Sequence, residues 1–178
     1  MTELTTSRLR LVAGQAPLVR AEINDHAEFG RLLGARVPAG WPPSEAADAL
    51  PWFLERLEAA GPAGVGWHGF YGIVTEAEGL EPVLVGGGGS LGPPEAGVVE
   101  IGYSLMPEFQ GKGYATEMMA AIVDWIARDP RVERIVAETD AGNEPSRRLL
   151  GRLGFVEVGT GREPNSLRFA REVRRGQS

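Results

Sequence analysis

The pattern that most constrains the fold is an abrupt change between residues 106 and 115. From Val98 to Met106, apolar residues alternate with polar or small ones, as they do in a strand. From Ala115 to Ile126, apolar residues instead recur at the spacing of one helix face. Glycines at positions 111 and 113 separate the two patterns. A strand, a turn and an amphipathic helix therefore follow one another directly, which predicts a helix packed on a sheet.

The rest of the chain adds strands and helices in an order typical of a mixed sheet. Strands are predicted at 9–13, 67–75, 82–91, 98–106, 132–139, 155–159 and 166–171, and helices at 16–33, 44–57, 115–126 and 143–153. Three consecutive strands joined by hairpins, followed by a strand–helix–strand unit, predict an α/β (α+β) fold. We expect a mixed, mostly antiparallel central sheet of about six to seven strands with helices on both faces. Residues 1–172 are expected to form a single domain, followed by a frayed tail at 173–178.

Caps, prolines and glycines refine these boundaries. Asn24 or Asp25 is expected to cap a second piece of the first helix, and Pro51 is expected to kink the next one. Residues 76–81 predict a polar turn between two strands. The run Gly86–Gly89 lies inside a strand pattern and is interpreted as a bulge or a thin place in the sheet.

Composition excludes several classes of function. The 178 residues include no cysteine, so disulfides, thiolate zinc sites and a cysteine nucleophile are ruled out. His26 and His68 show no metal-ligand spacing, so no metal is expected. The net charge of −6 argues against nucleic acid binding. No apolar run approaches the roughly 20 residues of a membrane helix, and no signal peptide is evident, so a cytoplasmic protein is expected.

The turn between strand and helix has the composition of an anion site. A helix N-terminus offers unpaired N–H groups and a partial positive charge. Gly111 and Gly113 allow a phosphate to approach the backbone closely, and Lys112, the only lysine, adds a charge. The alternative is a tight turn with no ligand. The turn matches neither the Walker motif nor the dinucleotide fingerprint, which would require glycine where Thr116 stands.

The wider sequence resembles the GNAT (Gcn5-related N-acetyltransferase) superfamily. The motif Gln/Arg-x-x-Gly-x-Gly/Ala is matched by Gln110, Gly113 and Ala115. Features similar to the RimJ/RimL-like branch are Glu100-Ile101-Gly102-Tyr103, then Asn143-x-x-Ser146-x-x-Leu149-Leu150-x-x-Leu153-Gly154-Phe155, and the opening Thr6-Ser7-Arg8-Leu9-Arg10-Leu11. The resemblance is strong over residues 98–159 and weak over 14–97.

This resemblance implies a splayed, V-shaped slot in the sheet that holds acetyl-CoA (CoA). Backbone groups of Leu105 and Met106 would pair with the pantetheine arm, and a strand-end N–H there would polarise the thioester carbonyl. The pyrophosphate would contact the turn formed by Gln110, Gly111, Lys112, Gly113, Tyr114, Ala115 and Thr116. Asn143 and Ser146 would contact the pantetheine arm; for Asn143 an N-cap role is an equal alternative.

Acetyl transfer to an amine requires a base for the ammonium and a proton donor for the leaving thiolate. Glu100 is the predicted base, with pairing to an arginine as the alternative. Leucine stands at position 150, where many relatives carry an acidic tyrosine. Ser146 is therefore the predicted catalytic partner of the sulfur, with Tyr103 and Tyr114 as alternatives.

The acceptor side is the least defined part of the sequence. Trp41, Trp67 and Tyr71 are candidate substrate-binding residues, with a place in the core as the alternative. Glu22 could attract a cationic amine, but a solvated surface position is the expected interpretation. We predict acetyl transfer to a primary amine (protein N-terminus, amino acid or small molecule) by direct attack in a ternary complex. Alternatives are a non-catalytic acyl-CoA-binding module and a transferase of longer acyl groups; a homodimer is a further expectation.

Overall fold

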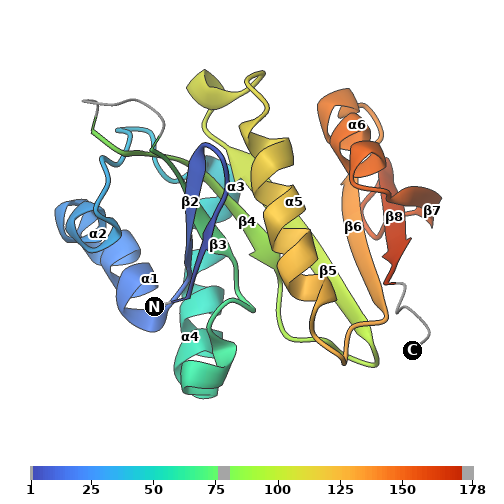
Figure 1. Ribbon diagram of the computed structural model, residues 1–178, viewed down its shortest axis with the longest axis horizontal. Coiled ribbons are helices and arrows are strands. Elements are labelled where there is room, and N and C mark those ends of the chain that lie inside the picture. The colour runs from blue at the N-terminus through green and yellow to red at the C-terminus, as the bar shows by residue number, and fades with distance from the viewer. Residues whose placement is uncertain (1, 76–80, 174–178) are drawn as a thin grey trace.

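A single open sheet of eight strands organises the molecule, as Figure 1 shows. The computed structural model describes residues 2–75 and 81–173. The strands are β1 (Glu3–Thr5), β2 (Leu9–Ala13), β3 (Phe70–Val74), β4 (Val83–Ser90), β5 (Val98–Leu105), β6 (Arg134–Asp140), β7 (Val156–Thr160) and β8 (Ser166–Glu172), in the spatial order β1-β2-β3-β4-β5-β6-β8-β7. Neighbours are antiparallel except β5 and β6, which are parallel.

The predicted fold class is confirmed, but the predicted strand count of six to seven is wrong. The strand that the sequence pattern did not predict is β1, three residues long and with no fully buried side chain. It pairs through its backbone with β2, so no hydrophobic alternation marks it. The predicted turn at 76–81 and the predicted tail lie almost wholly outside the described residues.

Helices cover the sheet between these strands. They are α1 (Ala16–Asn24), α2 (His26–Leu33), α3 (Ser44–Ala47), α4 (Leu50–Ala60), α5 (Tyr114–Ala127) and α6 (Glu144–Arg152), with short 3₁₀ turns at Gly61–Gly64 and Pro107–Phe109. Asp25 caps α2 by accepting from the N–H groups of Ala27 and Glu28, which confirms the predicted division of the first helix. The predicted helix 44–57 is interrupted at residues 48–49, directly before Pro51, which lies in the first turn of α4, where its missing N–H costs no hydrogen bond.

Two apolar clusters pack on opposite faces of the sheet. On one face, Met118 and Ile122 of α5 are fully buried with Ile135 of β6, and α6 joins this cluster. On the other face, Phe29 of α2 is buried with Ile73 of β3. Each fully buried side chain of this size contributes about 1.5–3 kcal/mol. The sheet is therefore anchored from both sides, as expected.

Strands β5 and β6 separate part of the way along their length. Their pairing runs only from Val98 opposite Arg134 to Ile101 opposite Ala137. β5 continues to Leu105 and β6 to Asp140 without further pairing between them. The two strands therefore form the arms of a V, and α5 lies in front of it in Figure 1.

The Gly86–Gly89 run is a place of close approach. The β3–β4 register shifts beside it, with Val85 as the extra residue. A Cβ atom at Gly86 would lie 2.4 Å from the Ser104 carbonyl oxygen, and one at Gly88 would lie 2.7 Å from the Met119 sulfur. The space that the sequence interpretation left open is thus already filled by β5 and α5.

Candidate active site

The turn before α5 has the geometry of an anion site. Gly111 and Gly113 have φ values of +74° and +82°, in the left-handed region that disfavours other residues. Gly113 is the N-cap of α5, so the first N–H groups of that helix have no partner within it. Within the described chain, no group accepts a hydrogen bond from the N–H of Gly111, Lys112 or Gly113. A row of backbone donors therefore lies at the positive end of a helix dipole.

Two side chains of the turn, Lys112 and Tyr114, lie near neighbouring groups outside the glycines. Lys112 is exposed, with its Nζ 5.5 Å from the centre of the Phe109 ring. The Tyr114 ring lies against the Arg8 guanidinium, whose carbon is 4.6 Å from the ring centre. Ala115 and Thr116 are half-buried in the first turn of α5. Lys112 therefore adds an exposed ammonium to the backbone donors of the turn.

The end of β5 directs alternate backbone groups to its two sides. The Met106 N–H donates to the Val85 carbonyl at 2.9 Å, on the β4 side. Because backbone groups alternate along a strand, those of Leu105 and Tyr103 point away from β4 and toward the V. Gln110 Nε2 donates to the Leu105 carbonyl at 3.3 Å. The backbone of Leu105 therefore faces the V, with its carbonyl engaged by Gln110, whereas the Met106 N–H is engaged by Val85 on the other side.

A hydrogen bond joins β5, one arm of the V, to α6, the helix that follows the other arm. The Tyr103 hydroxyl of β5 donates to Ser146 Oγ of α6 at 2.8 Å. Burial raises the pKa of Tyr103, and the hydrogen bond to Ser146 only partly offsets this. Asn143 Oδ1 accepts from the Ser146 N–H at 3.1 Å, so the N-cap alternative for Asn143 is observed. Sequence reasoning named Tyr103 and Ser146 as alternatives, and the structure unites them.

Glu100 lies at the closed end of the V, opposite Val136. Its carboxylate is ion-paired with the Arg162 guanidinium, which is the alternative that the sequence left open. Glu138 shares this network, accepting from the Arg162 N–H at 2.9 Å and from Arg168 at 2.6 Å. Burial alone would raise the pKa of Glu138, but these donors outweigh it and lower that pKa. A catalytic role for Glu100 stays a prediction.

A buried carboxylate organises the opposite side of β4 and β5. Trp41 Nε1 donates to Glu22 Oε1 at 2.7 Å, and the Tyr71 hydroxyl donates to Glu22 Oε2 at 2.5 Å. Glu22 is only 2% exposed, so its expected surface position is wrong. Burial raises the pKa of Glu22, and the two hydrogen bonds lower it only in part. No cation is seen to contact this carboxylate among the described residues.

This cluster lies beside the end of β5. A Cβ atom at Gly40 would be 3.2 Å from Met106 Cε, and one at Gly87 would be 4.0 Å from the Trp41 ring. Trp67, the third aromatic candidate, is elsewhere: it is buried on the α5 face, with its ring centre 5.0 Å from that of Trp125. The structure therefore unites Trp41 and Tyr71 but not Trp67.

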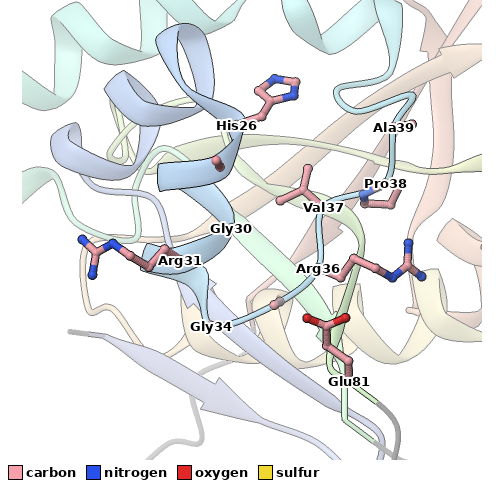
Figure 2. Close-up of a pocket in the computed structure, with 11 residues that line it drawn as sticks. His26, Gly30, Arg31, Gly34, Arg36, Val37, Pro38, Ala39 and Glu81 are labelled. Carbon is pink, nitrogen blue, oxygen red and sulfur yellow. The ribbon is translucent and has the colours of Figure 1, made fainter.

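Figure 2 shows a separate pocket between α2 and the segment 34–39. Its volume is about 620 Å³, and its charged lining includes Arg31, Arg36 and Glu81. Arg31 is held by Glu28 through hydrogen bonds of 2.6 and 2.7 Å. None of the predicted site residues lines the pocket, although its wall continues into the loop that carries Trp41.

Across residues 2–75 and 81–173, no three His, Asp or Glu side chains are grouped so that they could hold a metal ion. In the same part of the chain, every helix is too short or too polar to cross a membrane.

Sequence reasoning missed two features of this site. Nothing local links Glu22 to Trp41 and Tyr71, which lie 19 and 49 positions away along the chain. Arg8 and Glu117, which meet at the turn, were also missed as a pair. The sequence signal for this pair was the opening Thr6-Ser7-Arg8-Leu9, which the family resemblance includes without a role for Arg8.

Comparison with known proteins agrees with this geometry. Residues 8–156 match the family model described as Acetyltransferase (GNAT) domain. The uncharacterized N-acetyltransferase YjdG of Bacillus subtilis (strain 168) is 33% identical over 158 residues, covering 88% of this chain and 90% of the relative. The [Ribosomal protein uS5]-alanine N-acetyltransferase of Escherichia coli (strain K12) is 37% identical over 59 residues, covering 33% of this chain and 30% of that protein.

Solved structures share the fold at low sequence identity. The ribosomal L7/L12 alpha-N-protein acetyltransferase RimL, solved with coenzyme A, has a TM-score of 0.65 and 16% identity, covering 97% of this chain and 98% of its own. The ribosomal-protein-S5-alanine acetyltransferase from Vibrio fischeri has a TM-score of 0.64 and 18% identity, covering 97% of each chain. The chain therefore belongs to the GNAT acetyltransferase family and is an enzyme that transfers an acetyl group from acetyl-CoA to an amine.

Proposed function

We propose that this enzyme acetylates the α-amine at the N-terminus of a peptide or protein, within a ternary complex. The observation that carries this choice is the Glu100–Arg162 ion pair, which occupies the predicted base. A free α-amine has a pKa near 7.7–8.0, whereas a lysine side chain has one near 10.4. An α-amine therefore needs less help to lose its proton at neutral pH.

The residues present fit the cofactor. The exposed left-handed glycines and unpaired N–H groups of the turn suit a pyrophosphate. A Cβ atom at Gly102 would contact nothing within 4 Å, so β5 leaves room in the V. Acetyl-CoA supplies an acetyl thioester to this slot.

We assign binding of acetyl-CoA to backbone groups of the glycine turn and of β5. The pyrophosphate would be held by the N–H groups from Gly111 to Thr116. The pantetheine arm would pair with the backbone of Leu105 and Tyr103. Tyr103 takes the role predicted for Met106, because the Met106 N–H already donates to the Val85 carbonyl. Asn143 keeps Ser146 in place at the start of α6.

Proton handling is assigned to two separate groups. Tyr103 retains its proton at neutral pH because burial raises its pKa, and it donates to Ser146 Oγ. The Ser146 hydroxyl is then free to donate its own hydrogen to the departing sulfur. The α-amine releases its proton to water, because Glu100 is occupied by Arg162, which Glu138 also holds with its Oε1 3.4 Å from Arg162 Nε.

The acceptor would approach from the side of Glu22, Trp41 and Tyr71. The carboxylate of Glu22 gives that side a negative charge that is matched by no cation seen in the described chain, which favours a cationic amine. The names of the RimL and uS5-alanine relatives refer to ribosomal protein N-termini. Lysine-free peptides with a free N-terminus are therefore the first acceptors to test.

The test is product formation from acetyl-CoA, measured by mass spectrometry with two matched peptides. One has a free N-terminal alanine and no lysine; the other has a blocked N-terminus and one lysine. We expect acetylation of the first and at least tenfold less of the second. Preference for the lysine peptide would refute the α-amine assignment. Coenzyme binding without acetylation of any amine would favour a non-catalytic acyl-CoA-binding module.

A transferase of longer acyl groups is less well supported. A run of glycines such as Gly86–Gly89 beside the slot would offer room for a longer acyl chain only if nothing else filled it, and Ser104 and Met119 fill it. We therefore propose acetyl-CoA as the donor that the slot accommodates.

A further inference from the structure

The segment before β2 reaches across to the first turn of α5. There Glu117 accepts hydrogen bonds from Thr6 Oγ1 at 2.6 Å, from the Arg8 N–H at 2.8 Å and from Arg8 Nε at 2.6 Å. The side chains of Arg8 and Glu117 are 28% and 18% exposed. Burial alone would raise the pKa of Glu117, but the donors from Thr6 and Arg8 outweigh it and lower that pKa. Glu117 is thus an ionised anchor for Arg8.

The same guanidinium lies against the glycine turn. Arg8 Nη1 donates to the Lys112 carbonyl at 2.9 Å. Its central carbon is 4.6 Å from the Tyr114 ring centre. A Cβ atom at Gly113 would be 3.2 Å from Arg8 Nη2. Three successive residues of the turn are therefore packed on one side chain that lies 104 positions earlier in the sequence.

The hydrogen bond from Arg8 to the Lys112 carbonyl also sets the direction of the Gly113 N–H. The Lys112 carbonyl and the Gly113 N–H belong to the same planar trans peptide and point in opposite directions. Arg8 holds the carbonyl toward itself, so the Gly113 N–H points to the other, exposed side of the turn. Because Glu117 neutralises Arg8, the guanidinium orients this donor more than it attracts an anion.

We propose that Arg8, anchored by Glu117, is a positioning residue that fixes the pyrophosphate-binding conformation of the turn through the Lys112–Gly113 peptide. The inference rests on the proposed placement of the cofactor pyrophosphate at this turn. A turn that is already in its binding conformation loses less entropy when the anion binds. Without Arg8, two left-handed glycines would leave the turn with many conformations.

The test compares Arg8→Met and Arg8→Lys with a matched control, Arg134→Met. Arg134 also makes an arginine–glutamate pair, with Glu172 at 2.6 Å, but on β6. Calorimetric titration would measure the affinity for CoA. Competition against acetyl-peptide formation would measure the affinity for pantetheine, which lacks the pyrophosphate.

We expect Arg8→Met to weaken CoA binding about tenfold or more and to leave pantetheine binding unchanged. The rate at saturating acetyl-CoA should stay within about twofold of wild type, because Arg8 does not reach the reacting atoms. Arg8→Lys should fall between, since lysine cannot reproduce the fork of donors. Arg134→Met should bind CoA as wild type does.

Unchanged CoA affinity in a folded Arg8→Met variant would overturn the proposal. Equal weakening of CoA and pantetheine would also overturn it, because the effect would then not involve the pyrophosphate. If Arg8→Met does not fold, Arg8→Lys decides: wild-type affinity contradicts the proposal, and reduced affinity for CoA alone supports it. Wild-type protein that binds no CoA would instead refute the proposed cofactor site itself.

Discussion

The proposed cofactor side and the proposed acceptor side of this enzyme obtain their polar groups in different ways. On the cofactor side the donors are backbone groups of an exposed turn, oriented by two left-handed glycines and a helix start. On the acceptor side three buried side chains, Glu22, Trp41 and Tyr71, come from α1, the loop after α2 and β3. The first side therefore uses exposed backbone donors next to the Arg8–Glu117 pair, whereas the second uses buried side chains that pack across the sheet.

This difference separates binding from stability. A change in the exposed turn removes donors for a ligand but few contacts of the core. A change in the buried cluster leaves polar groups unpaired, so it weakens the fold together with acceptor binding. The following predictions test that separation.

The largest effect is expected at Gly86 of β4, which pairs directly with Leu105 of β5. Gly86→Ala places a Cβ atom 2.4 Å from the Ser104 carbonyl oxygen, so β5 must move. We expect a loss of about 3 kcal/mol in the free energy of unfolding, measured with urea. The matched control is Gly102→Ala, whose Cβ atom meets nothing within 4 Å. It should cost less than about 0.5 kcal/mol but weaken CoA binding, since Gly102 lies in the V. Equal stability of the two variants would contradict this account.

Removal of the buried carboxylate should have the next largest effect. Glu22→Leu leaves the Trp41 N–H and the Tyr71 hydroxyl unpaired, so we expect a loss of about 2 kcal/mol in stability. The KM for the peptide should rise while CoA affinity stays unchanged. Glu22→Gln can still hydrogen-bond to Trp41 and Tyr71 and should remain near wild-type stability. The KM of this variant for the peptide measures how much the negative charge of Glu22 contributes to peptide binding. A Glu22→Leu variant with weaker CoA binding and unchanged peptide KM would break the comparison.

The same carboxylate predicts a dependence of stability on pH. Burial raises the pKa of Glu22 above its ordinary value of 4.5. The protonated form therefore suits the fold, and its contribution is complete below pH 4.5 and is lost as pH rises through the raised pKa. From pH 4 to 8, the Tm of wild type should fall relative to that of Glu22→Gln. A constant difference in Tm between the two proteins would show that Glu22 is not a strained carboxylate.

The smallest effect is expected at Tyr103. Tyr103→Phe removes one neutral hydrogen bond to Ser146, so stability should fall by about 1 kcal/mol or less. The kcat should fall several-fold because Ser146 loses its orientation, and Ser146→Ala should lower it by a similar factor. Steady-state rates of the single and double variants measure this. Additive losses in the double variant would mean that the two hydroxyls act independently.

The same contrast explains what could be predicted from the sequence. The turn, the Asn143 cap and the order of strands depend on residues a few positions apart, and the sequence showed them. The Glu22 cluster depends on contacts across the sheet, and no local pattern distinguishes a buried glutamate from an exposed one. Trp67 shows the same limit, because its place beside Trp125 follows from the packing of α5. The Glu100–Arg162 pair likewise could not be predicted locally, because Arg162 lies in the turn between β7 and β8 and reaches Glu100 only when the sheet has formed.

The most direct test of the central claim is calorimetric titration of CoA into wild type, Gly113→Glu and Gly61→Glu. Both glycines have positive φ values, +82° and +57°, so both substitutions carry backbone strain, but Gly61 lies at the end of α4. The account predicts micromolar binding by wild type and by Gly61→Glu, and none by a folded Gly113→Glu, where a carboxylate would meet the pyrophosphate. No binding by wild type, or equal binding by Gly113→Glu, would contradict it.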